Sequence, residues 1–233
     1  MRFARAGYTL NGMEEEFLAT PVTGWRAWNL SGGATPMLHP VSVGATPWPA
    51  LEPFEARCES ASLLRRWRPH AAPAARCRCG IYAARSLRDF DRPRPAWPPA
   101  AVVGTVSLWG RVIEHARGWR AAAAYPGRLR LVCVMCAWFE PGLGEPVVVH
   151  AFGPRVYPLC EVHARGIETP GGPVSTPTDE SPAELQTRLL AAYAVDPLPV
   201  GSVEILFRRT RVLGSPASWP SADARRRARG ERA

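Results

Sequence analysis

The sequence predicts a mainly β fold with one or two helices (α+β), built as a small barrel or sandwich. Three observations support this prediction. The 233 residues include 20 Gly and 25 Pro, a content typical of many short strands and turns rather than long helices. The chain is 46% hydrophobic and 21% charged, so most of it has the apolar surface that a core needs. Residues 101–114 are dense in β-branched side chains, which favours one long strand.

The first element expected is a strand over residues 24–30 that ends at a turn over 31–33. Trp25 and Trp28 are three residues apart, so on a straight strand they face opposite sides of the sheet. Residues 34–57 are rich in Pro and Gly and predict irregular structure or short strands.

The strand over 101–114 is the strongest in the chain. Gly104 and Gly110 interrupt it and predict the bend of a long strand in a barrel-like sheet. A turn at 116–118 should send the chain back antiparallel along 119–125. The sequence therefore predicts a long hairpin within a β-rich domain.

The tetrapeptide Gly-Trp-Arg-Ala occurs at 24–27 and again at 118–121. The flanking residues do not match well enough to indicate a duplication. We expect a shared structural use, in which a Gly turn is followed by a packed Trp.

Two Cys-x-x-(Cys/His) pairs are the most specific chemical signal: Cys133-Val-Met-Cys136 and Cys160-Glu-Val-His163. Thiolate and neutral imidazole are ligands of tetrahedral Zn²⁺, and this spacing lets both ligands of a pair turn back onto one ion. The insert predicts two strands, at 131–139 and 146–152, and hence a zinc-ribbon-like module. A buried cluster of reduced Cys, or a disulfide or redox use, is the alternative.

A second set of metal-ligating residues lies upstream. Cys77 and Cys79 flank one residue, which places both thiols on one side of an extended segment, and Cys58 can reach them across a loop. His70 lies inside that loop and is favoured as a fourth ligand over His115. The alternatives to a second zinc site are three structural thiols beside a solvated His, or a reactive or oxidisable pair.

The best helix signal begins at Ser181, an N-cap followed by Pro182 at the first helical position and by Glu184, which completes a capping box. Helical spacing predicts that the helix runs to about residue 194 and buries Leu185, Leu189 and Tyr193. A last strand is expected at 203–207.

These elements suggest an order of segments along the chain. A disordered stretch or translation extension comes first, and the start codon is Met1 or Met13. The expected bounds are 1–19 for that extension, 20–130 for the β-rich domain, 131–166 for the zinc-ribbon-like module, 167–180 for a loop, 181–213 for a helix and strand closure, and 214–233 for a disordered basic tail.

The net charge is +9, and every basic residue is Arg. Uniform Arg with abundant Ala, Gly and Pro indicates a bias in coding composition, so the charge by itself is discounted as evidence for a nucleic-acid partner. No stretch approaches eighteen consecutive apolar residues, and no export signal is recognised, which predicts no membrane partner and a cytoplasmic, reducing location. Reduced thiols favour metal over disulfides.

The order of several pieces resembles a family of uncharacterised bacterial proteins, commonest in actinobacteria. These pieces are Gly24-Trp-Arg-Ala-Trp28, Cys77-Arg-Cys-Gly-Ile-Tyr-Ala83, Val103-Gly-Thr-Val-Ser-Leu-Trp-Gly-Arg-Val-Ile-Glu-His115 and Ala124-Tyr-Pro126. The resemblance covers about 20–130 and implies a shared β-rich domain. No activity is established for that family, so the resemblance implies no reaction or substrate.

Together these features favour a non-enzymatic, zinc-stabilised binding or regulatory module with a protein or nucleic-acid partner. One zinc site is expected at the downstream pairs, and a second is one of the alternatives left open for the upstream set. The alternative is a small thiol- or metal-dependent hydrolase that uses Cys79 and His115, since a His near a Cys can generate a thiolate nucleophile. No phosphate-binding Gly loop or dinucleotide fingerprint is present.

Overall fold

The computed structural model describes residues 9–10, 13–41, 46–58, 70–90, 100–136, 144–167 and 175–200. The strand expected at 203–207 and the basic tail lie outside these residues. Within them the fold is mainly β, with an antiparallel sheet and two α-helices, which confirms the predicted fold class. No helix in the described part of the chain is both long and apolar enough to cross a membrane.

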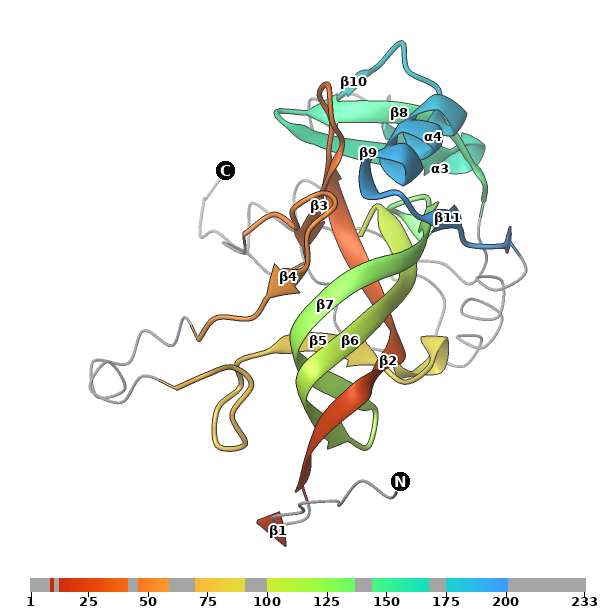
Figure 1. Cartoon of the computed structure of the whole chain (residues 1–233). Helices are drawn as coiled ribbons and strands as arrows, with labels where there is room; N and C mark the ends of the chain where they lie inside the picture. The colour runs from red at the N-terminus through yellow and green to blue at the C-terminus, as the bar shows by residue number, and fades with distance from the viewer. Residues whose placement is uncertain are drawn as a thin grey trace, which may run out of the picture.

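Three long strands form the body of the molecule (Figure 1): β2 (Met13–Ser31), β6 (Val102–His115) and β7 (Gly118–Leu131). β6 pairs antiparallel with both β2 and β7, and a two-residue turn joins it to β7. The predicted hairpin is therefore present. Residues 13–19, expected as an extension or disordered, belong instead to β2 and pair with β6. Three consecutive Glu have low strand propensity, so only the neighbouring strand explains this pairing.

β5 (Ile81–Ala84) closes these strands into a small barrel. It pairs antiparallel with β7 along its length and with β2 at Trp25↔Ala84, so the pairing circuit runs β2–β6–β7–β5–β2. Of the two architectures expected, barrel or sandwich, the structure shows the barrel. A barrel removes sheet edges that would otherwise be free to pair with another chain.

The repeated Gly-Trp-Arg-Ala segments flank β5, one on each side. A Cβ on Gly24 would lie 2.7 Å from the Cβ of Ala83, and a Cβ on Gly118 would lie 2.1 Å from the Ala83 carbonyl oxygen. Gly is needed at both positions because the backbones approach too closely for a side chain. The use that the two copies share is therefore a close approach to β5. The expected use was a Gly turn in each copy.

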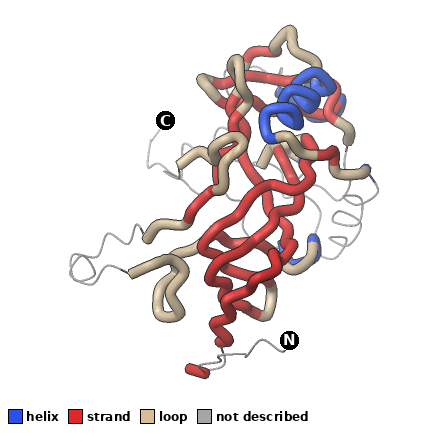
Figure 2. The backbone as a smooth tube through the Cα atoms, viewed as in Figure 1, coloured by secondary structure: helices blue, strands red, loops and turns tan. Residues whose placement is uncertain are grey.

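The described chain also contains shorter strands and helices. They are β1 (Thr9–Leu10), β3 (Met37–Pro40), β4 (Phe54–Glu55), the 3₁₀ helix η1 (Leu87–Phe90), β8 (Pro146–Phe152), β9 (Arg155–Cys160), α3 (Glu161–Ile167), β10 (Thr176–Pro177), α4 (Pro182–Tyr193) and β11 (Asp196–Pro197). β9 pairs with the end of β2, which joins the β8–β9 hairpin to the barrel. Figure 2 shows this hairpin and the two α-helices together at one end of the molecule.

The hairpin differs from the one expected. β8 pairs with β9, whereas the sequence suggested that 131–139 would pair with 146–152. β7 ends at Leu131 and the chain then turns at Val134-Met135, so no strand continues through the first Cys pair.

α4 begins as predicted. The Ser181 hydroxyl accepts from the Glu184 backbone N–H, while the Glu184 carboxylate accepts from the Ser181 N–H, which forms the capping box. Leu185, Leu189 and Tyr193 are all buried. The Tyr193 hydroxyl accepts from the Leu38 N–H at 2.9 Å and donates to the Trp48 carbonyl at 2.8 Å, which fixes α4 to the segment around β3.

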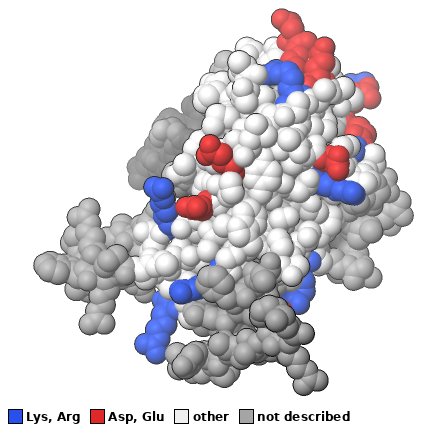
Figure 3. Space-filling model, viewed as in Figure 1, with Lys and Arg blue, Asp and Glu red and all other residues white. Residues whose placement is uncertain are grey.

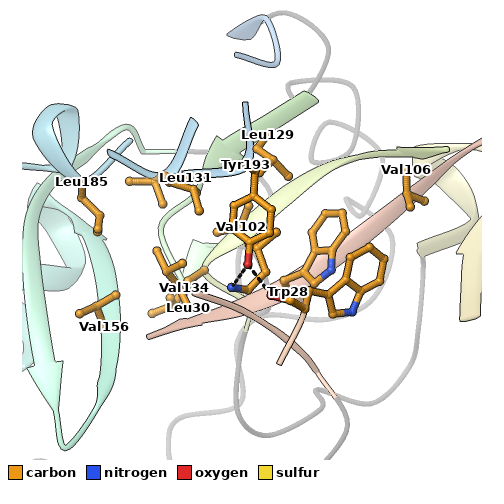
Figure 4. Close-up of a cluster of buried hydrophobic side chains, with 14 of the residues drawn as sticks. Trp28, Leu30, Val102, Val106, Leu129, Leu131, Val134, Val156, Leu185 and Tyr193 are labelled. Carbon is orange, nitrogen blue, oxygen red and sulfur yellow. Dashed lines mark hydrogen bonds between the residues drawn. The ribbon is translucent and has the colours of Figure 1, made fainter. Parts of the chain in front are cut away.

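One hydrophobic core extends from the barrel to the hairpin end (Figure 4). It includes Trp28 and Tyr193 together with Cys133, Cys136 and Cys160. Trp25 packs against a separate, smaller cluster, so the two Trp residues do face opposite sides of β2. The core therefore contains the thiols of the downstream Cys pairs.

Candidate metal centres

Two clusters of Cys and His are numbered by their order along the chain. The second cluster comprises Cys133, Cys136, Cys160 and His163. The first two lie in the turn after β7, Cys160 ends β9, and His163 lies in the first turn of α3. The Sγ atoms of Cys136 and Cys160 are 3.7 Å apart. Nδ1 of His163 lies 3.4, 3.4 and 3.2 Å from the sulfurs of Cys133, Cys136 and Cys160. The convergence predicted from the spacing is thus present.

These separations fit the edges of a metal-centred tetrahedron. Bonds of ~2.3 Å to sulfur and ~2.05 Å to nitrogen, at tetrahedral angles, give edges of about 3.8 Å for S···S and about 3.5 Å for S···N. The observed edges are 3.7 Å and 3.2–3.4 Å. All four ligand atoms lie within 4.8 Å of one another, so the cluster can hold one metal ion.

The order of elements around the second cluster is a Cys-x-x-Cys turn, a hairpin, and a helix that carries the second ligand pair. A hairpin follows the Cys-x-x-Cys turn, but it is formed by β8 and β9 and not by the two strands expected for a zinc-ribbon-like module; Cys160 ends β9 and His163 lies at the start of α3. Helical backbone at 161–167 brings residues three apart onto one face, which aims Cys160 and His163 at the same point.

The sulfurs of the second cluster are shielded from solvent. Cys133, Cys136 and Cys160 are at most 4% exposed. A Cβ on Gly144 would lie 2.7 Å from the Cys160 sulfur, so this position also requires Gly. The pKa of Cys133 is lowered to about 5, mainly by a hydrogen bond from Cys136, whose own pKa is raised by the same interaction. The interaction thus favours thiolate, the form in which Cys binds metals, at Cys133 and disfavours it at Cys136.

The first cluster comprises Cys58, His70, Cys77 and Cys79. The sulfurs of Cys58 and Cys77 are 3.7 Å apart, and the Cys79 sulfur is 3.4 Å from Nε2 of His70. These distances are again tetrahedral edges, and all four ligand atoms lie within 4.8 Å of one another. All four residues are half-buried. His70 therefore takes the fourth position, as favoured over His115.

The loop of the first cluster is shaped by Gly80. This residue has a φ of +121°, and a Cβ on it would lie 2.9 Å from the Cβ of Pro73. Positive φ at Gly costs little, so the chain turns from the Cys-x-Cys segment directly into β5. The pKa of Cys77 is lowered to about 6, chiefly by a hydrogen bond with the Cys79 backbone, whereas burial raises the pKa of Cys79 to about 11.

Arg120 is bonded to the backbone of the first cluster. It is 3% exposed and donates from Nη1 to the carbonyls of Cys77 and Cys79, the latter at 3.1 Å. Its Nε donates to Nε2 of His115 at 2.8 Å. A divalent ion with three thiolates carries a net charge of −1, so Arg120 provides a nearby countercharge.

His115 is therefore engaged with Arg120 and not with a thiol. Burial and the charge of Arg120 lower its pKa. The Cys79 sulfur contacts His70 instead. The sequence analysis contains Arg120 only as part of the Gly-Trp-Arg-Ala segment at 118–121 and missed its contacts with the Cys77 and Cys79 carbonyls. Its place in the second Gly-Trp-Arg-Ala copy was the available signal.

The two remaining His residues lie outside the clusters. His150 on β8 is 5% exposed, and its Nδ1 is 3.1 Å from the Ser175 hydroxyl. β10 pairs with β8 at this point, with Pro177 opposite His150. His39 pairs with the Ser31 hydroxyl at 3.0 Å. All six Cys are free thiols, and they divide equally between the two clusters.

No protein-family model, curated protein or solved structure matches this chain. Its function is therefore inferred from the geometry of its own residues.

Proposed function

We propose that this chain is a non-enzymatic binding or regulatory module whose two Cys₃His clusters each hold Zn²⁺. The observation that supports this most strongly is that protein side chains supply all four corners of each tetrahedron. Structural zinc sites are closed in this way, whereas catalytic sites keep one position for water or substrate. The proposal includes a reducing, cytoplasmic setting, in which the six thiols stay available as ligands.

Zinc fits the donor set better than other common ions. Three thiolates and one imidazole are soft to borderline ligands, which excludes Mg²⁺ and Ca²⁺ as preferred ions. Tetrahedral sites rich in sulfur also suit iron, so metal analysis must cover both elements. The tetrahedral edges described above agree with zinc bond lengths.

The enzymatic alternative lacks support from the geometry. A nucleophilic Cys79 would need a lowered pKa and a base within hydrogen-bond reach. Burial raises the pKa of Cys79, and its sulfur lies 3.4 Å from Nε2 of His70, another member of the first cluster. His115, the proposed base, has its Nε2 bonded to Arg120. We therefore assign Cys79 to metal binding.

Metal content and thiol reactivity together test the proposal. Elemental mass spectrometry of the purified chain should give two zinc ions per molecule. A thiol reagent should react slowly with all six Cys, and chelation should make the three half-exposed thiols of the first cluster react before the three buried ones. Absence of zinc would overturn the proposal. Fast reaction of one Cys without chelator would favour the thiol enzyme.

A further inference from the structure

Three exposed Arg residues lie directly beside ligands of the first cluster. Arg57 precedes Cys58, while Arg76 and Arg78 alternate with Cys77 and Cys79. None of the three Arg side chains has an ion pair or hydrogen bond within the described chain. Other exposed Arg residues do have carboxylate partners, for example Arg85 with Glu114 and Arg165 with Glu161. The charges at the first cluster are thus left available.

Folding, and not sequence proximity, gathers these charges. Arg57 is nineteen positions from Arg76, yet the neighbouring ligand atoms of Cys58 and Cys77 are only 3.7 Å apart. Arg76 and Arg78 are both exposed and lie on either side of Cys77 in a loop that turns at residues 75–76 and bends at Cys77. Figure 3 shows basic groups and no neighbouring acidic groups at the lower left of this face. In Figure 1 the chain leads into β5 on this side.

An exposed aromatic ring adjoins the same segment. Tyr82 on β5 is 45% exposed. Its hydroxyl donates to the Arg78 carbonyl at 2.8 Å, and its own carbonyl accepts from Arg26. The guanidinium of Arg120 lies over the ring, 5.8 Å from the centroid, so the exposed area belongs to the other face and the edge.

Two contacts therefore hold the exposed side chain: the hydroxyl bond to the Arg78 carbonyl and the guanidinium of Arg120 over the ring. Exposure of the apolar ring area is unfavourable, so a partner that covered it would gain this free energy. A rigid exposed ring loses little conformational entropy when a flat partner stacks on it. The arrangement is a prepared stacking surface beside unpaired cations.

We propose that the surface formed by Arg57, Arg76, Arg78 and Tyr82 binds single-stranded nucleic acid. This inference rests on the proposed function, since metal binding fixes the loop that carries the Arg residues. Arg contacts phosphate, and aromatic rings stack on unpaired bases. The total charge of the chain is not specific to this surface. The position of these three charges beside Tyr82 is what supports nucleic-acid binding.

Single strands fit this surface better than other polyanions. Duplex DNA is read by a helix or ribbon inserted into the major groove, and the Cys-x-Cys loop is neither. The bases of a duplex are also paired and stacked on one another, so they cannot stack on Tyr82. An acidic protein would use the Arg residues but has no general need of an exposed ring.

Fluorescence anisotropy with a labelled oligothymidylate of about twelve nucleotides tests the inference on the zinc-loaded full chain. With three phosphate contacts the log–log dependence of affinity on salt should include a contribution of about −2 from this surface. The triple change Arg57→Gln, Arg76→Gln and Arg78→Gln should remove that contribution. Tyr82→Leu should weaken binding about 5- to 100-fold, and Tyr82→Phe should keep most of it.

Arg128→Gln is the matched control, because Arg128 is exposed on β7, ten residues beyond Gly118, and forms no ion pair within the described residues. It should leave both affinity and salt slope at this surface unchanged. The basic run at 225–229 is present in every variant, so differences between variants report on the surface alone.

Two results would overturn the inference. One is an unchanged salt slope in the triple variant. The other is equal binding of polyglutamate and of the single strand, with no effect of Tyr82→Leu, which would indicate an acidic protein partner. A chain that holds two zinc ions but binds no oligonucleotide refutes only this inference, whereas a chain without zinc refutes the proposed function.

Discussion

Replacing one thiolate in each cluster by serine should have unequal consequences, although the chemical change is the same. Cys160→Ser removes a ligand that is 4% exposed and belongs to the main hydrophobic core. Cys58→Ser removes a half-buried ligand next to the loop at 70–80, which supplies no member of either hydrophobic cluster. We expect each variant to retain one zinc ion in place of two.

The expected magnitude follows from what each ion holds together. Structural zinc binding in small fingers amounts to about 10–16 kcal/mol, and a folded domain is stable by only about 5–15 kcal/mol. The second cluster ties the turn after β7 to β9 and α3, and β9 pairs with β2 at Leu30 and Ser31. Loss of its ion should therefore unfold the hairpin end and loosen the core. Loss of the first ion should free a surface loop and lower the melting temperature by only a few degrees, about 1–2 kcal/mol.

Elemental mass spectrometry, near-ultraviolet circular dichroism and thermal melting measure these outcomes. Trp28 and Trp48 lie in the core with ring centroids 5.4 Å apart, so their dichroism reports on core packing. It should collapse in Cys160→Ser and persist in Cys58→Ser. A Cys160→Ser chain that keeps its dichroism and melting temperature would refute the argument, as would a Cys58→Ser chain that loses them.

Two further predictions concern hydrogen bonds that only the folded chain shows. Tyr193→Phe leaves the buried Leu38 N–H and Trp48 carbonyl without their partner, which should cost about 2–4 kcal/mol in urea unfolding with an unchanged m-value; a loss below 0.5 kcal/mol would mean that water replaces the hydroxyl. Arg120→Gln removes the countercharge and a carbonyl contact at the first cluster, so competition with a chelator should show at least tenfold weaker zinc binding there. The second cluster in the same molecule is the internal control, and equal weakening at both would indicate general unfolding.

Local patterns determined a large part of this structure. The β-branched run at 101–114 and the turn after it became β6 and the start of β7. Ser181 and Glu184 formed the predicted cap, because every atom involved lies within four residues. The Cys-x-x-(Cys/His) and Cys-x-Cys spacings also indicated which side chains converge on one point, since a short segment has few ways to place two side chains.

Tertiary structure decided which distant segments meet. The hairpin partner of β8 is β9 and not 131–139, because the chain turns directly after Leu131. His70 and not His115 completes the first cluster, because His115 lies against Arg120. His150 is buried on β8 opposite Pro177 of β10, a pairing that no local pattern indicates.

The sequence by itself thus determined the fold class, the members of the second cluster, the three Cys of the first cluster and the capped helix. The barrel closure at Trp25↔Ala84, the role of Arg120 and the surface around Tyr82 depend on pairings between residues 38 to 59 positions apart. Such pairings are set by the packing of whole strands and by the cost of closing the loops between them. No local pattern records that balance, so only the folded chain shows which charges and rings share a surface.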